Sequence, residues 1–317
     1  MKKLLILMVT LIALIILSYL LIPSNKLYEW VMTLERNVAN LAVRQINIQQ
    51  GQIEYLEGGE GEVLILLHGF GADKDAWNRM AKHLTPHFHV IAIDLPGFGN
   101  SFKDRHLNYD VQMQVKWLKE TVAHLNLSQF HLAGNSMGGY IAANYAALNP
   151  GKISSLWLIN TLGVATAPDS KMFKDITQKK RPAVLANSKL QYKQLISNVF
   201  HNAPYMPDFF IEALARNAVD NFSMNKQIFD DIHHTSDHQV NFSSPLENAL
   251  AGFERPLLIT WGEKDKIVHP DGANILHKIV PTSKVKIIDQ VGHVPMIEVP
   301  KLTARQFIDF HHRTNID

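Results

Sequence analysis

The stretch Gly134-Asn135-Ser136-Met137-Gly138 is the part of the sequence that says most about the fold. It follows the pattern Gly-x-Ser-x-Gly, with a strand-like run at 129–133 before it and a helix-like run at 140–147 after it. A serine on so sharp a strand-to-helix turn exposes its hydroxyl at the end of a sheet, and the flanking glycines avoid the clash that a Cβ would cause. Ser136 is therefore the candidate nucleophile.

A serine hydroxyl needs a base within hydrogen-bond reach, and the base needs a group that orients it. In a sheet of this kind the serine, the acid and the histidine follow one another in that order along the chain. Asp265 stands just after a predicted strand, and His293 stands just after the last predicted strand. Glu263 is the nearest rival acid, but the Gly-x-x-Asp loop carries Asp265 further toward the C-terminal edge of its strand. We therefore expect Asp265 to orient His293, and His293 to act as the base.

An oxyanion hole needs two backbone N–H groups. One is expected from Met137, the residue after the nucleophile, at the positive end of a helix. The other is expected from Phe70, in a loop that directly follows an early buried strand. The neighbours of Phe70 are expected to support that loop, with a structural role for the imidazole: His68, Gly69 and Gly71.

Strand-like and helix-like segments alternate along most of the chain. The strands are predicted at 63–67, 89–93, 129–133, 155–159, 256–260 and 285–288, after a hairpin of 45–50 and 52–57. Helices are predicted between them, at 109–125, 139–148 and 273–280. This order predicts an α/β fold with a doubly wound, mostly parallel sheet.

One long region breaks the alternation. Residues 163–251 contain no convincing buried strand and read as helical. We interpret them as a helical cap, or lid, inserted into a core domain that comprises 45–162 and 252–317.

The N-terminus predicts attachment to a membrane. Lys2 and Lys3 precede an apolar run over 4–22, which is long enough to span most of a ~30 Å hydrocarbon core. Because no Ala-x-Ala pattern ends the run, an uncleaved signal anchor over 1–24 is favoured, with secretion after cleavage as the alternative. The two lysines favour a cytoplasmic N-terminus and an extracytoplasmic (periplasmic) catalytic domain. The segment 25–44 is predicted to be a juxtamembrane helix, lying either on the membrane surface or against the domain.

Composition excludes several other classes of function. The net charge is only +2 and no dense Lys/Arg stripe is present, so nucleic acid is not an expected partner. The absence of cysteine excludes disulfides and thiolate chemistry. One cluster in the cap contains residue types that bind metals, but not at a recognised ligand spacing: His233, His234, Asp237 and His238. No metal and no cofactor are therefore expected.

Together these motifs resemble the α/β-hydrolases, and among them the membrane-anchored monoacylglycerol lipases and the related cold-adapted bacterial lipases. The resemblance covers about residues 45 to 312 and is carried by five stretches: 68–77, 94–101, 134–139, 261–265 and 292–295. It implies hydrolysis of acylglycerols or similar lipid esters, without a cofactor, through an acyl-enzyme on Ser136. It also implies Asp265 and His293 as the other members of the triad.

Two alternatives remain open at the level of sequence. The same Gly-Asn-Ser-Met-Gly-Gly turn occurs in hydrolases that cleave carbon–carbon bonds in ring-fission products and use the same triad. A non-catalytic binding protein on this fold is the second alternative, although the complete Ser136, Asp265 and His293 set argues against it.

Overall fold

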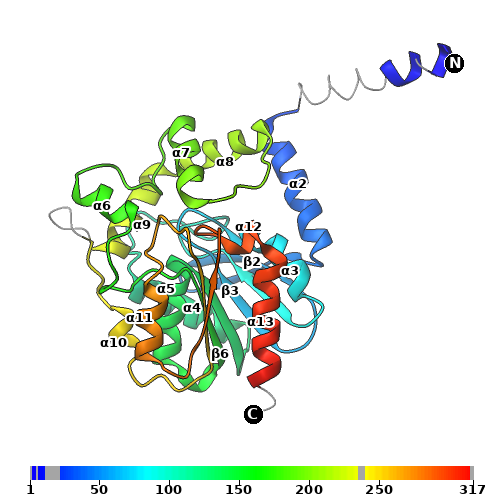
Figure 1. The fold of residues 1–317 in the computed structure, drawn as a ribbon. Coiled ribbons are helices and arrows are strands. Elements are labelled where there is room, and N and C mark those ends of the chain that lie inside the picture. The colour runs from blue at the N-terminus through cyan, green and yellow to red at the C-terminus, as the bar shows by residue number, and fades with distance from the viewer. Residues whose placement is uncertain (1, 5, 11–21, 235–239, 315–317) are drawn as a thin grey trace.

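The computed structural model describes residues 2–4, 6–10, 22–234 and 240–314. The described residues contain the strands β1 (Ala42–Ile48), β2 (Gly51–Gly58), β3 (Val63–Leu67), β4 (His89–Ile93), β5 (Phe130–Asn135), β6 (Ile153–Ile159), β7 (Leu257–Gly262) and β8 (Lys284–Ile288). They form one sheet in the order β1-β2-β4-β3-β5-β6-β7-β8 (Figure 1). The β1–β2 and β2–β4 pairs are antiparallel, and the pairs from β4 to β8 are parallel. The predicted mostly parallel sheet is confirmed, with the expected hairpin at its edge.

Helices occupy the connections between the strands. Their bounds are α2 (Ser24–Val38), α3 (Asn78–Leu84), α4 (Val111–His124), α5 (Met137–Leu148), α6 (Lys171–Thr177), α7 (Lys189–Val199), α8 (Asp208–Asp220), α9 (Phe222–His233), α10 (Leu246–Ala249), α11 (Gly272–Ile279), α12 (Pro295–Glu298) and α13 (Pro300–Thr314). Figure 1 shows α4, α5 and α11 on one side of the sheet and α3 and α13 on the other. The sheet is therefore doubly wound.

The central strand β3 shows why the uninterrupted apolar run at 63–67 predicts a strand that is buried on both faces. Ile65 and Leu67 belong to the core on the α4–α5 side, whereas Leu64 and Leu66 belong to the core on the α3–α13 side. Because successive side chains of a strand point to opposite faces, a strand covered by helices on both faces must be apolar at every position.

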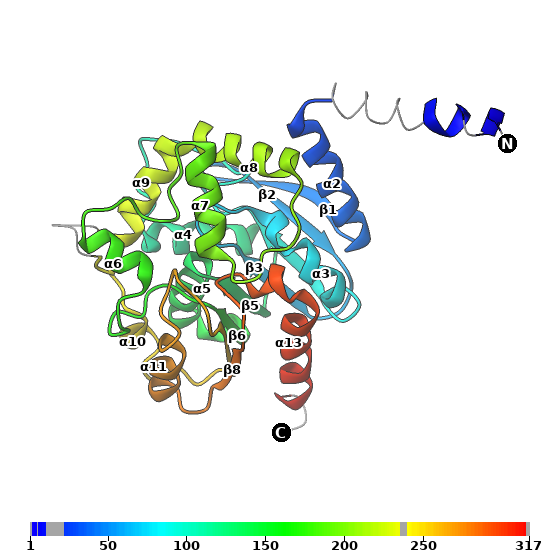
Figure 2. The same cartoon turned by 45° about the horizontal axis from the view of Figure 1, so that its top comes forward.

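The connection from β6 to β7 is long and helical. Helices α6 to α10 lie in it, and α6 to α9 cover one end of the sheet (Figures 1 and 2). Serine N-caps begin two of these helices, since the Ser170 side chain accepts the N–H of Phe173 and the Ser188 side chain accepts the N–H of Gln191. This end of the sheet is where the parallel strands terminate and where Ser136 lies.

Helix α2 packs against the domain. The ring of Tyr28 lies 4.9 Å from that of Phe210 in α8, and Met32 is buried. Arg36 forms two hydrogen bonds with the Asp75 carboxylate, one of them from Nε to Oδ1 at 2.7 Å. The helix was predicted to lie either on the membrane surface or against the domain. Tyr28, Met32 and Arg36 make contacts with the domain.

The helix expected over 25–44 ends earlier, at Val38. Asn40 adopts a left-handed φ of 54°, and the N–H of Leu41 turns back to the carbonyl of Arg36 at 2.9 Å. This is a Schellman-type end with asparagine in the position that glycine usually occupies, and β1 begins at Ala42.

Most of the predicted N-terminal span lies outside the described residues, which leave out 5 and 11–21. Residues 2–4 and 6–10 are helical, and Leu4, Ile6, Leu7, Met8 and Val9 are exposed. Within the residues that are described, no helix has both the length and the apolar character required to traverse a bilayer.

Candidate active site

Ser136 sits on a strained turn between β5 and α5. Its backbone has φ 54° and ψ −119°, a conformation that a residue with a side chain rarely adopts. A Cβ on Gly134 would lie 2.2 Å from the carbonyl oxygen of Gly138, and a Cβ on Gly138 would lie 2.2 Å from that of Leu67. Any side chain at Gly134 or Gly138 would therefore clash with neighbouring backbone, and this is why the Gly-x-Ser-x-Gly pattern has glycine at both positions.

His293 and Asp265 meet at this same end of the sheet. Nδ1 of His293 lies 2.8 Å from Oδ2 of Asp265, and both side chains are buried. The other oxygen, Oδ1, accepts the N–H of Ile267 at 2.8 Å. An acceptor at Nδ1 places the ring proton there and leaves Nε2 unprotonated, as a general base requires. Glu263, the rival acid, instead lies 3.3 Å from Nζ of Lys264.

Asn160 is a further residue of the site that the sequence reasoning overlooked. Its amide Nδ2 donates to Oδ2 of Asp265 at 2.7 Å and to the carbonyl of Gly292 at 3.2 Å. Asn160 is fully buried at the C-terminal end of β6 and has a left-handed φ of 44°. A polar residue directly after a buried strand was the signal that could have revealed it.

His68 braces the loop that carries the predicted oxyanion donor. Its Nδ1 donates to the carbonyl of Gly69 at 2.8 Å, and its Nε2 accepts the N–H of Leu95 at 3.0 Å. Burial lowers the pKa of His68, so the ring is held in the neutral form that these two bonds need. A Cβ on Gly69 would lie 3.2 Å from Cβ of Ser136, which shows how closely this loop approaches the nucleophile.

The two predicted oxyanion donors lie in the loop that follows β3 and at the start of α5. Phe70 follows Gly69 in the loop, and its ring contacts Phe98 at 5.6 Å and Phe229 of the cap at 5.7 Å between centroids. Met137 is the first residue of α5, and the first N–H groups of a helix have no acceptor within that helix. The positive end of α5 therefore points at the site.

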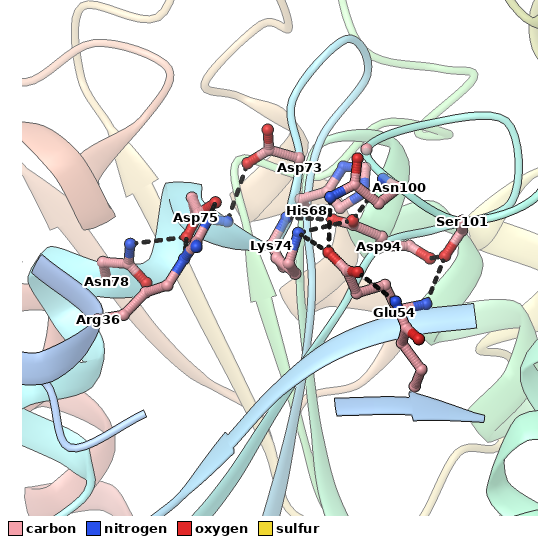
Figure 3. A network of polar contacts seen from close by, with 12 residues as sticks. Arg36, Glu54, His68, Asp73, Lys74, Asp75, Asn78, Asp94, Asn100 and Ser101 are labelled. Atoms are coloured by element: carbon pink, nitrogen blue, oxygen red, sulfur yellow. Dashed lines mark hydrogen bonds and ion pairs between the residues drawn. The ribbon is translucent and has the colours of Figure 1, made fainter. Parts of the chain in front are cut away.

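A buried ion network anchors the same loop to β2 and β4 (Figure 3). Nζ of Lys74 lies 2.9 Å from Oδ2 of Asp94 and 2.9 Å from Oε1 of Glu54. The backbone N–H of Lys74 also donates to Oδ1 of Asp94 at 2.7 Å. Although burial opposes its charge, Asp94 and the other acidic neighbours hold the pKa of Lys74 above its usual value. The network was another feature that sequence reasoning missed, because its three members are far apart in the chain.

A cavity of ≈ 230 Å³ begins at Ser136 and His293 and extends below the cap. It is far larger than the roughly 10–15 Å³ that one water molecule needs. Most of its wall is apolar, and α7, α8 and α2 contribute six of the apolar side chains: Leu195, Ile196, Val199, Phe210, Leu214 and Met32. The structure thus places the N-terminal helix in the wall of the pocket, which the sequence did not predict.

The wall also has a polar part made by Asp73, Tyr28 and Tyr192. Burial, with the charges of Asp75 and Asp94, raises the pKa of Asp73 to about 7. Burial raises the pKa of Tyr28 as well, and the nearby Asp73 adds to this. Near neutral pH this part of the pocket therefore presents hydroxyl and partly protonated carboxyl groups.

The histidine cluster of the cap does not assemble as a metal site in the described residues. His233 is buried, its Nδ1 lies 2.8 Å from the carbonyl of Phe229, and its ring stacks on the Phe229 ring at 4.0 Å. Burial lowers the pKa of His233 to about 4. His234 ends α9 in a left-handed conformation. Asp237 and His238 lie outside the described residues.

Comparison with known proteins agrees with this geometry. The family described as alpha/beta hydrolase fold matches residues 62–300, and the chain belongs to it. The resemblance expected from the sequence is confirmed.

Two relatives and one solved structure define its place in the family more closely. Lipase 3 of Moraxella sp. (strain TA144) is 34% identical over 282 residues, which cover 87% of this chain and 86% of that protein. Monoacylglycerol lipase ABHD6 of Bos taurus is 27% identical over 309 residues, covering 92% and 88%. The crystal structure of a membrane phospholipase A, a bacterial virulence factor, superposes with a TM-score of 0.88 at 35% identity and covers 99% of both chains.

Proposed function

We propose that this protein is a serine carboxylic ester hydrolase that acts on acylglycerols or similar lipid esters. The observation that carries the proposal is the His293–Asp265 hydrogen bond at 2.8 Å, with Ser136 and His293 both lining one largely apolar cavity. The lipase and monoacylglycerol lipase relatives support the same class of substrate.

The reaction begins when Nε2 of His293 takes the proton of the Ser136 hydroxyl and Oγ attacks the ester carbonyl. Asp265 keeps the imidazole in the correct tautomer and stabilises the imidazolium. His293 then gives the proton to the leaving alcohol, which departs and leaves an acyl-enzyme on Ser136. Water, activated by His293, attacks the acyl-enzyme, and collapse of the second tetrahedral intermediate releases the acid and restores Ser136.

The N–H groups of Phe70 and Met137 stabilise the tetrahedral oxyanion, each contributing about 2.7–4 kcal/mol of transition-state stabilisation. Asn160 acts as a positioning residue, because it donates to the Asp265 oxygen that also accepts from His293. His68, Gly69 and Gly71 shape the loop that presents the Phe70 N–H.

We also propose the division of the chain expected from its sequence: a core of 45–162 and 252–317, with 163–251 as the cap. Helices α6 to α10 in the β6–β7 connection support it. In this arrangement the acyl chain lies along α7 and α8, whose apolar side chains line the cavity.

The N-terminal segment 1–24 is proposed to anchor the protein through 4–22, with the catalytic domain on the extracytoplasmic side. One further observation supports contact with lipid. Trp30, Leu34 and Val38 are exposed on α2 at four-residue spacing, so they form one apolar stripe on the side away from the domain. A tether of this kind holds the pocket near the phase in which long-chain esters dissolve.

Hydrolysis of p-nitrophenyl esters from acetate to palmitate, by the full chain in detergent micelles, tests the proposed function. We expect turnover to peak at medium or long chains and to fall by roughly 10³-fold or more in Ser136→Ala. Ser197→Ala, a serine on the surface of α7, is the matched control and should retain full activity. Cleavage of a ring-fission dienoate in place of esters would favour the carbon–carbon hydrolase, and Ser136-independent ester turnover would refute the proposal.

A further inference from the structure

Three side chains with metal-ligating atoms meet at the end of the sheet opposite to Ser136. Glu62 directly precedes β3, His131 is the second residue of β5, and His311 lies in the last turns of α13. Since β5 advances roughly 3.3 Å per residue, His131 and Ser136 are about 16 Å apart along the strand. The cluster is therefore separate from the ester-hydrolysing site.

The distances within the cluster suit one small cation. Nε2 of His131 lies 2.8 Å from Oε2 of Glu62, and Nε2 of His311 lies 3.9 Å from Oε1 of the same carboxylate. One ligand atom from each of the three residues lies within 4.8 Å of the other two. Tetrahedral zinc with bonds of about 2.0–2.2 Å places its ligands about 3.4 Å apart, within the spread observed here.

Both imidazoles are held in orientation by neighbours that are not ligands. Nδ1 of His131 lies 2.8 Å from Oγ of Ser155, which leaves Nε2 to face Glu62. The rings of His131 and His311 are perpendicular, with centroids 5.0 Å apart, and both pack edge-on against Phe88. Such outer contacts orient first-shell histidines in known metal sites.

The chemistry of the cluster also fits. Burial lowers the pKa of His131 and of His311, and metals bind the neutral imidazole. The side chain of Glu62 is 57% exposed, which leaves the cluster open on one side to an incoming ion and to a water ligand. Two imidazoles and one carboxylate are a donor set that zinc favours, whereas magnesium and calcium prefer oxygen ligands alone.

We propose that Glu62, His131 and His311 bind one Zn²⁺ ion, with water as the fourth ligand. The ion joins the C-terminal helix α13 to the N-terminal ends of β3 and β5. Because zinc binds the folded chain at three positions that are distant in sequence, it stabilises the native state by an amount that grows with the logarithm of the zinc concentration above the dissociation constant. The ion stabilises the fold and takes no part in ester hydrolysis, since Ser136 lies about 16 Å away along β5.

Zinc titration of the full chain, freed of metal by dialysis against a chelator, tests this proposal. We expect calorimetry to give one Zn²⁺ per chain and the thermal unfolding temperature to rise with ZnCl₂. Glu62→Gln and His311→Gln should each weaken zinc binding by roughly ten-fold or more and reduce the thermal shift at the same ZnCl₂ concentration. His89→Gln is the matched control, because His89 lies 3.0 Å from Glu57 as a single His–Glu pair on the same sheet.

Two measurements keep the interpretation unambiguous. Ester hydrolysis by Glu62→Gln and His311→Gln should match that of the parent, since neither residue lines the cavity. Each variant's own zinc-free unfolding temperature is the baseline for its thermal shift, because both substitutions also remove contacts with His131 that do not depend on metal. Zinc uptake that is equally strong in these variants, or that is absent in the parent, would overturn the proposal. Because the chain has no cysteine, thiolate ligands cannot account for any uptake.

Discussion

Asn160 offers the sharpest test of how Asp265, the proposed orienting carboxylate, is held. Asn160→Gly removes the amide that donates to Oδ2 of Asp265 at 2.7 Å, and glycine accepts the left-handed φ of 44° without strain. A hydrogen bond to a charged group contributes about 1.5–3 kcal/mol. His293 becomes charged in the transition state. If the transition state loses this ~1.5–3 kcal/mol of stabilisation, kcat falls by about 10- to 150-fold.

The assay is steady-state hydrolysis of a medium-chain p-nitrophenyl ester, with kcat and KM measured separately between pH 6 and 9. Asn160 is absent from the cavity wall within the described residues, so KM should stay near the parent value while kcat falls. Asn160→Asp should lose more activity than Asn160→Gly at pH 8, because a second carboxylate then faces Asp265 and shifts the pH profile.

Asn126→Gly is the matched control for this experiment. Asn126 also has a left-handed φ, of 54°, but it lies on the exposed turn that follows α4. It should leave kcat and KM unchanged. An unchanged kcat in Asn160→Gly, or a fall confined to KM, would refute the argument that Asn160 acts through Asp265.

Two other substitutions probe the buried charges near the oxyanion loop. Lys74→Met leaves Asp94 and Glu54 without their shared cation and should lower the free energy of unfolding by about 3–5 kcal/mol, as measured by urea denaturation at pH 7. A loss below about 1 kcal/mol would contradict the burial of that charge. Asp73→Asn should stabilise the protein, because the pKa of Asp73 is about 7 in the folded state and the unfolded chain ionises near 3.8. The folded state keeps its proton between those values, so the parent loses stability as pH rises from 4 to 7. The advantage of Asp73→Asn should therefore grow over that window and stay constant above it, and an advantage that is independent of pH would exclude titration of Asp73 as the cause.

Much of the core was predictable because its signals are local. The bounds predicted for β3 and β4 match the observed strands, since an apolar run between turn residues defines a buried parallel strand. The candidate nucleophile, acid and base were predicted from their positions after strands, and in the structure Asp265 and His293 are in hydrogen-bond contact. Parallel strands end at one edge of the sheet, so residues that follow such strands gather there.

Other features depend on contacts between distant segments and left no local pattern. Helix α2 was predicted, but not that Tyr28 and Met32 would line the pocket, because that depends on how α8 meets α2. Likewise no spacing rule connects Glu62, His131 and His311, which only the folding of α13 against the sheet brings together. Histidines that are close in sequence, such as those between 233 and 238, form a visible pattern, and no metal is expected from the sequence.

The central claim is that Ser136 is the nucleophile, and covalent labelling tests it most directly. The full chain is treated with a fluorophosphonate, and the modified residue is located by mass spectrometry of proteolytic peptides. The account predicts one adduct, on Ser136, which is absent in Ser136→Ala and forms far more slowly in His293→Ala. Ester hydrolysis by a chain that carries its adduct on another residue, or that carries none, would contradict the account.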